Sequence, residues 1–264
     1  MVERIVPGTQ EWSDMHADHL ARYLFAVDFV KQRSVLDAGT GVGYGAAVLK
    51  AYQAAAVHAV DLDPQAIATA EKLFGHLGVS YLVDDCEDLG RVHGPFDVVC
   101  SFENLEHLQE PSRFLARAAD LLAPDGVLLC STPDRAHTRP FINGKPANPY
   151  HVHEWYEDEF MSLLSHHFGD VTLMTQVQHN ASRERQCALR SLVNYLEQVQ
   201  RGTLFGLKQL VKRAVGRRVY RPDLEALARP TVADFPIMPS SIAKLVGKPW
   251  CHVAVCRMPR RGSL

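Results

Sequence analysis

Short apolar runs alternate with longer amphipathic stretches over the first half of the chain. The apolar runs have the length of buried strands, and the residues between them recur at helical spacing. Strands that alternate with helices in this way predict an α/β protein with a parallel sheet and helices on both faces. The predicted strands are residues 34–37, 57–61, 79–83, 96–102 and 126–131, and the predicted helices are residues 12–30, 43–56, 64–77 and 111–122.

The second half of the chain is less regular. It opens with a loop rich in Pro, Asn and His over residues 132–153, and it carries no internal repeat. We expect a single domain over residues 1–264, with a core of residues 12–180 and 250–258 and an insertion over about 180–249. The elements predicted here are a helix over 157–167, a strand over 171–177, a mainly helical stretch over 182–213, a weakly periodic stretch over 214–250 and a strand over 252–257.

The composition allows a full hydrophobic core and narrows the class of protein. Hydrophobic residues make up 47% of the 264 residues, and the net charge is -2, which argues against a general nucleic-acid coat or a membrane-surface protein. No apolar run is long enough to span a bilayer, and the first residues lack the apolar core of a signal peptide. None of the 6 cysteines forms a CxxC pair, so buried reduced thiols are the simpler interpretation than disulfides. A cytoplasmic location is therefore expected.

A glycine turn, Asp37-Ala38-Gly39-Thr40-Gly41-Val42-Gly43, joins the first predicted strand to the next helix. Glycines at alternate positions allow a sharp turn with positive φ and let a ligand approach the main chain. An ordinary strand-to-helix turn could also use them, and Gly41, Gly43 and Ala46 fit the loose dinucleotide fingerprint. The glycines alone therefore leave two cofactors open.

Asp37 favours one of the two. A pyrophosphate binds to backbone donors and a helix N-terminus, and a carboxylate beside it would repel it. A cofactor with an amino cation and a sulfonium would instead be attracted. The acid ahead of the first glycine therefore favours S-adenosylmethionine.

Acidic residues also follow the next two strands. Asp61 could accept hydrogen bonds from both ribose hydroxyls, whereas Asp63, which directly precedes Pro64, fits a helix N-cap better. Asp85 could accept from an adenine amino group while the backbone N–H of Cys86 donates to a ring nitrogen. The alternative for this second acidic stretch is a solvated loop.

The stretch after the fourth strand contains Glu103, Glu106 and His107, which would share one face of a helix. Such a set suits a divalent cation, with His151 or His153 from the downstream loop as a fourth ligand. Oxygen-rich ligation favours Mg²⁺ or Mn²⁺, while two histidines favour Mn²⁺, Fe²⁺ or Zn²⁺. Without a metal, the glutamates could favour a helix N-terminus, and His107 could be a lone general base or a half-buried structural histidine.

Five segments in order resemble the class I S-adenosylmethionine-dependent methyltransferase family over roughly residues 18–180: VLDAGTGVGYGAAVL, AVDLDP, DDCEDL, FDVVCSFENLEHL and LLAPDGVLLCSTP. The resemblance implies a Rossmann-like, seven-stranded, mostly parallel sheet with a helical insertion between strands six and seven. Its last strand, HVAVCR, would run antiparallel and pair with residues 171–177. The cofactor-binding residues that it implies are Asp37, Gly39, Thr40, Gly41, Gly43, Asp61, Leu62, Asp85, Cys86 and Phe102.

The ExxEH pattern, with a histidine ahead of an aromatic-xxEF helix, is similar to plant small-RNA 2′-O-methyltransferases. There it resembles a Mg²⁺ site that clamps vicinal ribose hydroxyls. Matching through Trp155 and Glu159-Phe160 selects His151 rather than His153 as the ligand. The resemblance thus implies the metal ligands Glu103, Glu106, His107 and His151 and the catalytic residues Glu106, His107 and His153.

The expected substrate comes from a further resemblance, to bacterial tailoring enzymes for sugars and secondary metabolites. It implies O-methylation of a hydroxyl on a sugar or a glycosylated small molecule. Six basic residues between Lys208 and Arg221 suggest either a solvated helix face or a contact for a substrate phosphate. RNA is less favoured, because the net charge is negative and no aromatic-basic RNA module is present. An oxidoreductase, a ribose 2′-O-methyltransferase and a non-catalytic relative remain alternatives, and a homodimer is compatible with the sequence.

Overall fold

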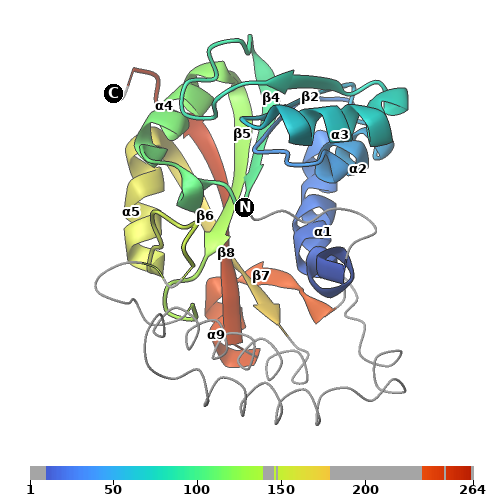
Figure 1. The fold of residues 1–264 in the computed structure, drawn as a ribbon. Helices are drawn as coiled ribbons and strands as arrows, with labels where there is room; N and C mark the ends of the chain where they lie inside the picture. Colours follow the sequence, from blue (N-terminus) through green and yellow to red (C-terminus); the bar gives the residue numbers. More distant parts are fainter. Residues whose placement is uncertain (1–9, 139–145, 147, 179–233, 247, 263–264) are drawn as a thin grey trace, which may run out of the picture.

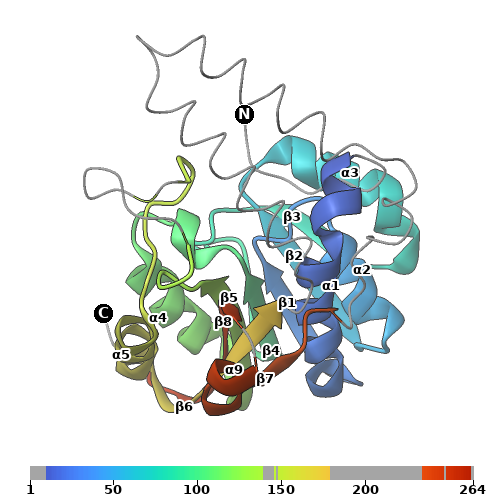
Figure 2. The ribbon, with the colours of Figure 1, turned by 90° about the horizontal axis from the view of Figure 1, so that it is seen from below.

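The computed structural model describes residues 10–138, 146, 148–178, 234–246 and 248–262. In this part of the chain one mixed sheet lies between two layers of helices (Figures 1 and 2). This arrangement confirms the predicted α/β class with helices on both faces. One layer holds α1 (Gln10–Val30), α2 (Tyr44–Ala51) and α3 (Pro64–Phe74), and the other holds α4 (Pro111–Leu121) and α5 (Glu157–His167).

The sheet has eight strands within the described residues, in the order β3-β2-β1-β4-β5-β8-β6-β7. The first five run parallel, while β8 runs antiparallel to both β5 and β6. The predicted antiparallel last strand and its pairing are therefore confirmed. The strands are β1 (Ser34–Ala38), β2 (Ala56–Asp61), β3 (Ser80–Val83), β4 (Phe96–Phe102), β5 (Leu122–Pro133), β6 (Phe168–Gln178), β7 (Ile237–Pro239) and β8 (Lys248–Pro259).

The expected number of seven strands is wrong, because β7 adds an eighth at the edge. It pairs with residues 174–176 of β6 and leads into α9 (Ser240–Val246). Three residues are too few to show an alternating pattern, and Pro239, which lacks an N–H, is tolerated on an edge strand. The predicted helical stretch 182–213 and the basic segment 208–221 lie outside the described residues.

Two helix ends also differ from the prediction. Helix α2 stops at Ala51 instead of running to residue 56, since Tyr52 leaves the helical region and Gln53 has a φ of 70°. The predicted helix over 64–77 ends as α3 at Phe74 and continues as a 3₁₀ turn, η1 (Gly75–Leu77). Apolar periodicity does not register these ends, because the residues that follow them are still compatible with a helical pattern.

The core has two parts, one on each side of the sheet. Neighbouring residues of β1 face opposite parts: Val35 packs toward α1 and α2, and Leu36 packs toward α4 and α5. Both are fully buried, as expected for a parallel strand covered on both faces. The five cysteines in the described ranges are buried and free, in agreement with the predicted burial. None of the described helices is both long and apolar enough to cross a membrane.

The strand order brings two predicted site segments together. β1 pairs with β4 in parallel, so both strands end at the same edge of the sheet. The chain leaves β1 toward β2 and leaves β4 toward β5, in opposite directions along the sheet. This is the topological switch point at which open α/β sheets bind ligands. The glycine turn and the stretch after Phe102 flank it.

Candidate active site

The three glycines of the turn have φ angles of 80° at Gly39, 56° at Gly41 and 81° at Gly43. Side chains other than glycine are strained in this region. A Cβ added at Gly39 would lie 2.6 Å from the Asn104 side chain, and one at Gly43 would lie 2.6 Å from Ala70. At Gly41 no atom lies within 4 Å of that position. The outer glycines thus pack against the protein, while Gly41 faces open space.

Asp37 is fully buried at the end of β1. Thr40 Oγ1 donates a hydrogen bond of 2.6 Å to its Oδ2, and the Tyr23 hydroxyl donates one of 3.1 Å to its Oδ1. Burial raises the pKa of Asp37 to about 6, although both hydrogen bonds act to lower it. The site therefore holds a carboxylate whose two side-chain partners are neutral hydroxyls. Sequence reasoning missed Tyr23, because nothing in the spacing of α1 marks which of its aromatic residues reaches β1.

Asp61 is held by two backbone N–H groups, one from the glycine turn and one from the residue that precedes α3. Its Oδ2 accepts from Gly41 N–H at 2.9 Å and its Oδ1 accepts from Asp63 N–H at 2.9 Å. These two bonds fix the orientation of the Asp61 carboxylate at the sheet edge. Next to it, Leu62 is 66% exposed. Asp63 caps α3 by accepting from Gln65 N–H at 2.8 Å, which confirms the predicted N-cap.

The acidic loop after β3 is organised by the carboxylate of Asp84, for which the sequence predicted no role. Asp84 is buried and accepts from the backbone N–H groups of Asp85 and Arg91. Asp85 itself is half-buried and accepts from Glu87 N–H at 2.9 Å. Cys86 is buried, and burial raises the pKa of its thiol. The loop therefore keeps Asp85 and Cys86 at the edge predicted for the adenine.

Glu103 leaves β4 with a φ of 51°, and its N–H donates to the Ser131 carbonyl. The predicted helical face shared by Glu103, Glu106 and His107 is therefore wrong. Ser131 Oγ donates to Glu103 Oε1 at 2.8 Å, and Arg22 Nη2 lies 3.9 Å from Glu103 Oε2. Burial by itself would raise the pKa of Glu103, but the Arg22 guanidinium, His19 and the hydrogen bonds from Ser131 and Cys251 together outweigh it and lower this pKa to about 2. The Glu103 side chain is therefore directed toward Ser131 on β5 and toward the buried Arg22 cation, and not along a helix face with Glu106 and His107.

Arg22, the cation behind Glu103, is fully buried on α1. Its Nη1 donates to the Gln176 side chain on β6, while its Nε and Nη2 have no hydrogen-bond partner in the structure. Phe102, predicted to contact the cofactor, is buried next to α1 and meets the Tyr23 ring edge-on at 5.1 Å. Arginine is rarely buried in full, so no sequence signal distinguished Arg22 from a surface residue.

Three predicted residues do converge. One ligand atom each of Glu106, His107 and His151 lies within 4.8 Å of the other two, so this group could hold a metal ion. A 3₁₀ turn, η2 (Leu105–His107), carries the first two, and the Val152 N–H binds the Glu106 carbonyl at 2.7 Å and brings in His151. Glu106 is buried, its Oε2 has no hydrogen-bond partner, and burial together with the nearby Glu103 raises its pKa.

His153 does not join this group. Its Nε2 lies 3.2 Å from the Gln109 carbonyl, and its ring stacks on Trp155 with 5.5 Å between centroids. His107 and His151 instead meet edge to face, with 5.1 Å between centroids. Of the predicted acid and imidazole residues, Glu106, His107 and His151 bring their ligand atoms together, while the Glu103 carboxylate and the His153 ring are outside this group.

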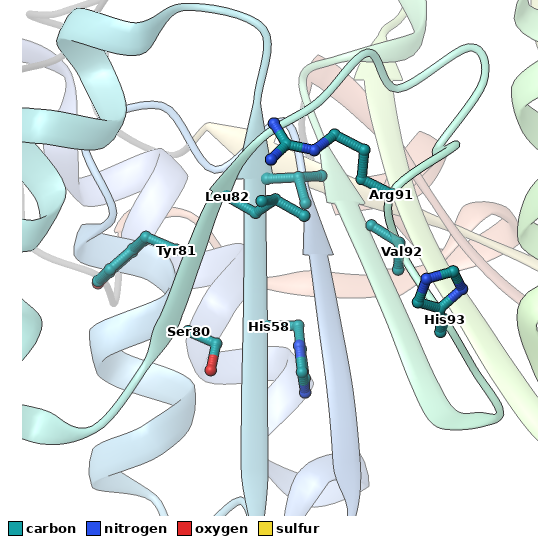
Figure 3. Close-up of a pocket in the computed structure, with 8 residues that line it drawn as sticks. His58, Ser80, Tyr81, Leu82, Arg91, Val92 and His93 are labelled. Atoms are coloured by element: carbon teal, nitrogen blue, oxygen red, sulfur yellow. The ribbon is translucent and has the colours of Figure 1, made fainter.

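A cavity of about 230 Å³ lies elsewhere, between β2, β3 and residues 91–93 (Figure 3). His58 and Ser80 lie side by side on it, because these residues are register partners in the two strands. Its lining contains no carboxylate, so it lacks the donor set of the group at Glu106. The lining residues are His58, Val60, Ser80, Tyr81, Leu82, Arg91, Val92 and His93.

Comparison with known proteins adds independent information. A family model described as a methyltransferase domain matches residues 12–202. A protein of Mycobacterium tuberculosis named a probable S-adenosylmethionine-dependent methyltransferase is 33% identical over 162 residues, which are 61% of this chain and 58% of the relative. A ubiquinone biosynthesis O-methyltransferase of Xylella fastidiosa is 32% identical over 146 residues, 51% of this chain and 59% of the relative. The chain thus spans less than two thirds of both relatives.

Among solved structures, the [4+2]-cyclase SpnF has a similar fold, with a TM-score of 0.57 at 13% identity. The similarity covers 92% of this chain and 82% of SpnF. At this identity the likeness concerns the fold alone. A shared fold does not establish a shared reaction.

Proposed function

Because this chain belongs to the class I S-adenosylmethionine-dependent methyltransferase family, we propose that it transfers a methyl group from S-adenosylmethionine to a hydroxyl oxygen. The observation that carries the proposal is the convergence of Glu106, His107 and His151 at the same sheet edge as the glycine turn. One side of this edge has the features of a cofactor site, and the other has acid and imidazole groups that could bind or deprotonate an acceptor.

The residues at the turn suit the cofactor. Gly41 offers open space over the main chain, and Asp61 is a fixed carboxylate for the ribose hydroxyls. Asp37, buried between two neutral hydroxyls, would be stabilised by the amino cation of the methionine moiety. The exposed Leu62 side chain offers an apolar surface for one face of the adenine. Together with the family, these features favour the methyl donor over the dinucleotide that the glycines alone left open.

The acid and imidazole group suits a divalent cation. Glu106 Oε2 is a buried oxygen without a hydrogen-bond partner, which is the condition of a carboxylate prepared for a ligand. Two imidazoles and one carboxylate favour Mn²⁺, Fe²⁺ or Zn²⁺ over Mg²⁺. A cation held there would act as a Lewis acid and favour the ionised form of an acceptor hydroxyl. We therefore propose a metal-assisted transfer, with Glu106, His107 and His151 as the ligands and without Glu103.

The acceptor class is a finer proposal. Oxygen is favoured by the acid and imidazole groups and by the O-methyltransferase name of the Xylella fastidiosa relative. A cation with free coordination positions suits vicinal hydroxyls, which sugars and ribose both carry. We propose a sugar or a glycosylated small molecule, since the net charge of -2 does not favour RNA.

A methyl-transfer assay with labelled S-adenosylmethionine tests this function. The acceptors would be free sugars, glycosides, sugar phosphates, ribonucleosides, a short RNA and, as a nitrogen-acceptor control, an amine of similar size. Each reaction would run in chelator and again with Mn²⁺, Fe²⁺, Zn²⁺ or Mg²⁺. We expect a methyl ether on a sugar-like acceptor, with Mn²⁺ increasing the rate and chelator decreasing it.

Transfer that is equally fast in chelator would contradict the metal assistance but not the O-methylation. Exclusive N-methylation would contradict the proposed acceptor. Binding of S-adenosylhomocysteine without transfer to any acceptor, under all metal conditions, would favour a non-catalytic protein or one with a different reaction. The [4+2]-cyclase SpnF is a protein of similar fold that is named for a different reaction. Exclusive methylation of the short RNA would favour the ribose 2′-O-methyltransferase alternative.

A further inference from the structure

The loop from Asn148 to Glu154 forms hydrogen bonds whose directions can be deduced, and they determine which nitrogen of His107 and of His151 carries the proton. We propose that Glu154 is a positioning residue, which holds His151 as the Nδ1–H tautomer and leaves Nε2, which accepts from Asn148 in this structure, as the unprotonated nitrogen that a cation beside Glu106 and His107 would take over from that amide. The inference deepens the proposed function and rests on it for its purpose, but not for its geometry.

The orientation of the Asn148 amide is the first step. The backbone N–H of Tyr150 can only donate, and it lies 3.0 Å from Asn148 Oδ1. The atom that faces Tyr150 must therefore be the amide oxygen, which places the NH₂ group on the other side. This removes the usual ambiguity between the two ends of an asparagine side chain.

The amide then determines the tautomer of His151. Asn148 Nδ2 lies 2.9 Å from His151 Nε2. An NH₂ group can only donate, so Nε2 must accept and cannot carry a proton. In the neutral ring the proton is therefore on Nδ1, which lies 2.9 Å from Glu154 Oε1. The three contacts agree with a single tautomer.

Glu154 is well placed to maintain this tautomer. Its side chain is only 2% exposed, so water does not replace its partners. Its second oxygen, Oε2, accepts from Thr138 Oγ1 at 2.6 Å, which fixes the rotation of the carboxylate. A buried carboxylate that accepts from the far nitrogen of a histidine is a recurrent way to orient a metal ligand and to increase its basicity.

The same loop sets the orientation of His107. The Tyr150 carbonyl can only accept, and it lies 2.9 Å from His107 Nδ1. In the neutral ring His107 is thus also an Nδ1–H tautomer with an unprotonated Nε2. The peptide groups of Tyr150 therefore act on both histidines, through its N–H and Asn148 for His151 and through its C=O for His107. Glu154 supplies the only side-chain charge among these described contacts.

Nitrogen NMR of ¹⁵N-histidine-labelled protein, prepared without metal and in alkaline buffer, tests the tautomer directly. Imidazole nitrogens with and without a proton resonate at different shifts, so the method reports the tautomer whether or not a metal binds. The chain has 13 histidines, and the signal of His151 is identified by its absence in His151→Gln. We expect the Nδ1–H form in the unmodified protein and a partial shift toward the Nε2–H form in Glu154→Ala, in which only the neutral Asn148 amide still favours Nδ1–H.

Two further variants separate orientation from folding. In Glu154→Gln the amide oxygen can still accept from Nδ1, so the tautomer should be retained although the charge is lost. Thr138→Val removes the contact on the other oxygen and should leave the His151 tautomer unchanged. An Nε2–H tautomer in the unmodified protein, or an unchanged Nδ1–H tautomer in a folded Glu154→Ala, would overturn the inference.

Calorimetric titration with Mn²⁺ alone then links the tautomer to the cation. We expect Glu154→Ala to weaken Mn²⁺ binding by about 10- to 100-fold, as for other partners of metal-bound histidines, and Glu154→Gln to weaken it less. If Mn²⁺ binding is lost in His151→Gln but unchanged in Glu154→Ala, the positioning role is wrong and the metal site stands. If the unmodified protein binds no metal while the tautomers are as deduced, the metal assistance is wrong and the orientation of His151 by Glu154 stands.

Discussion

The two sides of the sheet edge are built in different ways. On the proposed cofactor side, the main chain does most of the positioning: Gly39, Gly41 and Gly43 take positive φ, and Asp61 is held by two backbone N–H groups. On the proposed acceptor side, the groups are positioned by side chains. His107 and His151 come from segments far apart in sequence, and their rings are oriented by a carbonyl and by a buried carboxylate.

This difference has a consequence for how each side tolerates change. A site made of backbone geometry depends on few residue types, and within it a side chain can change if φ is preserved. A site made of side chains depends on each partner, because a group that loses its hydrogen bond in a buried place costs free energy or turns elsewhere. We therefore expect substitutions on the acceptor side to affect the reaction and those on the cofactor side to affect binding.

The largest expected effect is that of a substitution at Glu106. If this effect is not observed, the proposed division of roles between the two sides of the sheet edge is wrong. Glu106→Gln should decrease kcat by about 100- to 10,000-fold, the range typical of acid–base and ligand groups, while the Kd for S-adenosylhomocysteine stays within about twofold. Asp61→Asn should do the reverse and weaken cofactor binding more than kcat, because it removes an acceptor of ribose hydroxyls. Steady-state kinetics and calorimetry measure the two quantities.

His153→Asn is the matched control for this experiment. His153 lies in the same loop as His151, but its ring binds the Gln109 carbonyl and stacks on Trp155, so kcat should change by no more than about threefold. A loss as large as that of Glu106→Gln would restore the role first predicted for His153. Equal losses of kcat and of cofactor affinity in Glu106→Gln would remove the division between the two sides.

The next effect concerns Arg22 and tests whether this buried cation holds Glu103 away from the group formed by Glu106, His107 and His151. Arg22→Met leaves the Glu103 carboxylate buried beside no cation, and we expect a loss of about 3 to 5 kcal/mol in the free energy of unfolding. The double variant with Glu103→Gln should recover part of this loss, because no uncompensated charge remains. Urea unfolding of the two single variants and the double variant gives the coupling. Strictly additive losses would show that Glu103 does not depend on Arg22.

The third effect is a pH dependence of the cofactor side. The pKa of Asp37 is raised from 3.8 to about 6, so the folded protein binds this proton more tightly than the unfolded chain does. Stability of the cofactor-free protein should therefore fall as the pH rises from about 4 to about 6, by about 3 kcal/mol, and stay level above that. Thermal unfolding across this range measures it, and Asp37→Asn should remove this component.

The cofactor should show the opposite trend. Its amino cation is attracted to the ionised form of Asp37, so affinity for S-adenosylhomocysteine should increase as the pH rises through about 6. In Asp37→Asn the affinity should be lower and should no longer follow the pH in this range. An unchanged pH profile in that variant would assign the dependence to another group.

The sequence predicted the local backbone geometry of the proposed cofactor side. Glycines at Gly39, Gly41 and Gly43 report directly on backbone angles, and the N-cap at Asp63 reports on a helix start next to it in sequence. These features depend on residues that are close together in the sequence, so residue type and spacing are enough to predict them. The order of strands and helices was predictable for the same reason, since each element carries its own apolar period.

The acceptor side could be predicted only in part. The predicted residues Glu106, His107 and His151 do come together, but the helix face predicted for Glu103, Glu106 and His107 is wrong, because Glu103 turns toward Ser131 and toward Arg22. The bond that holds Arg22 in place joins it to Gln176, 154 residues away in sequence. A pattern of neighbouring residues cannot predict a contact between residues so far apart in the sequence.

By itself, then, the sequence determined the α/β order, the glycine turn and the chemistry available at the sheet edge. Only the tertiary structure decided which of these groups meet. It brought His151 to Glu106 through a backbone hydrogen bond, left His153 on Trp155 and buried Glu154 where it orients a ring. The physical reason is that backbone angles depend on the residue that adopts them, whereas the orientation of a buried side chain depends on partners that folding brings from elsewhere in the chain.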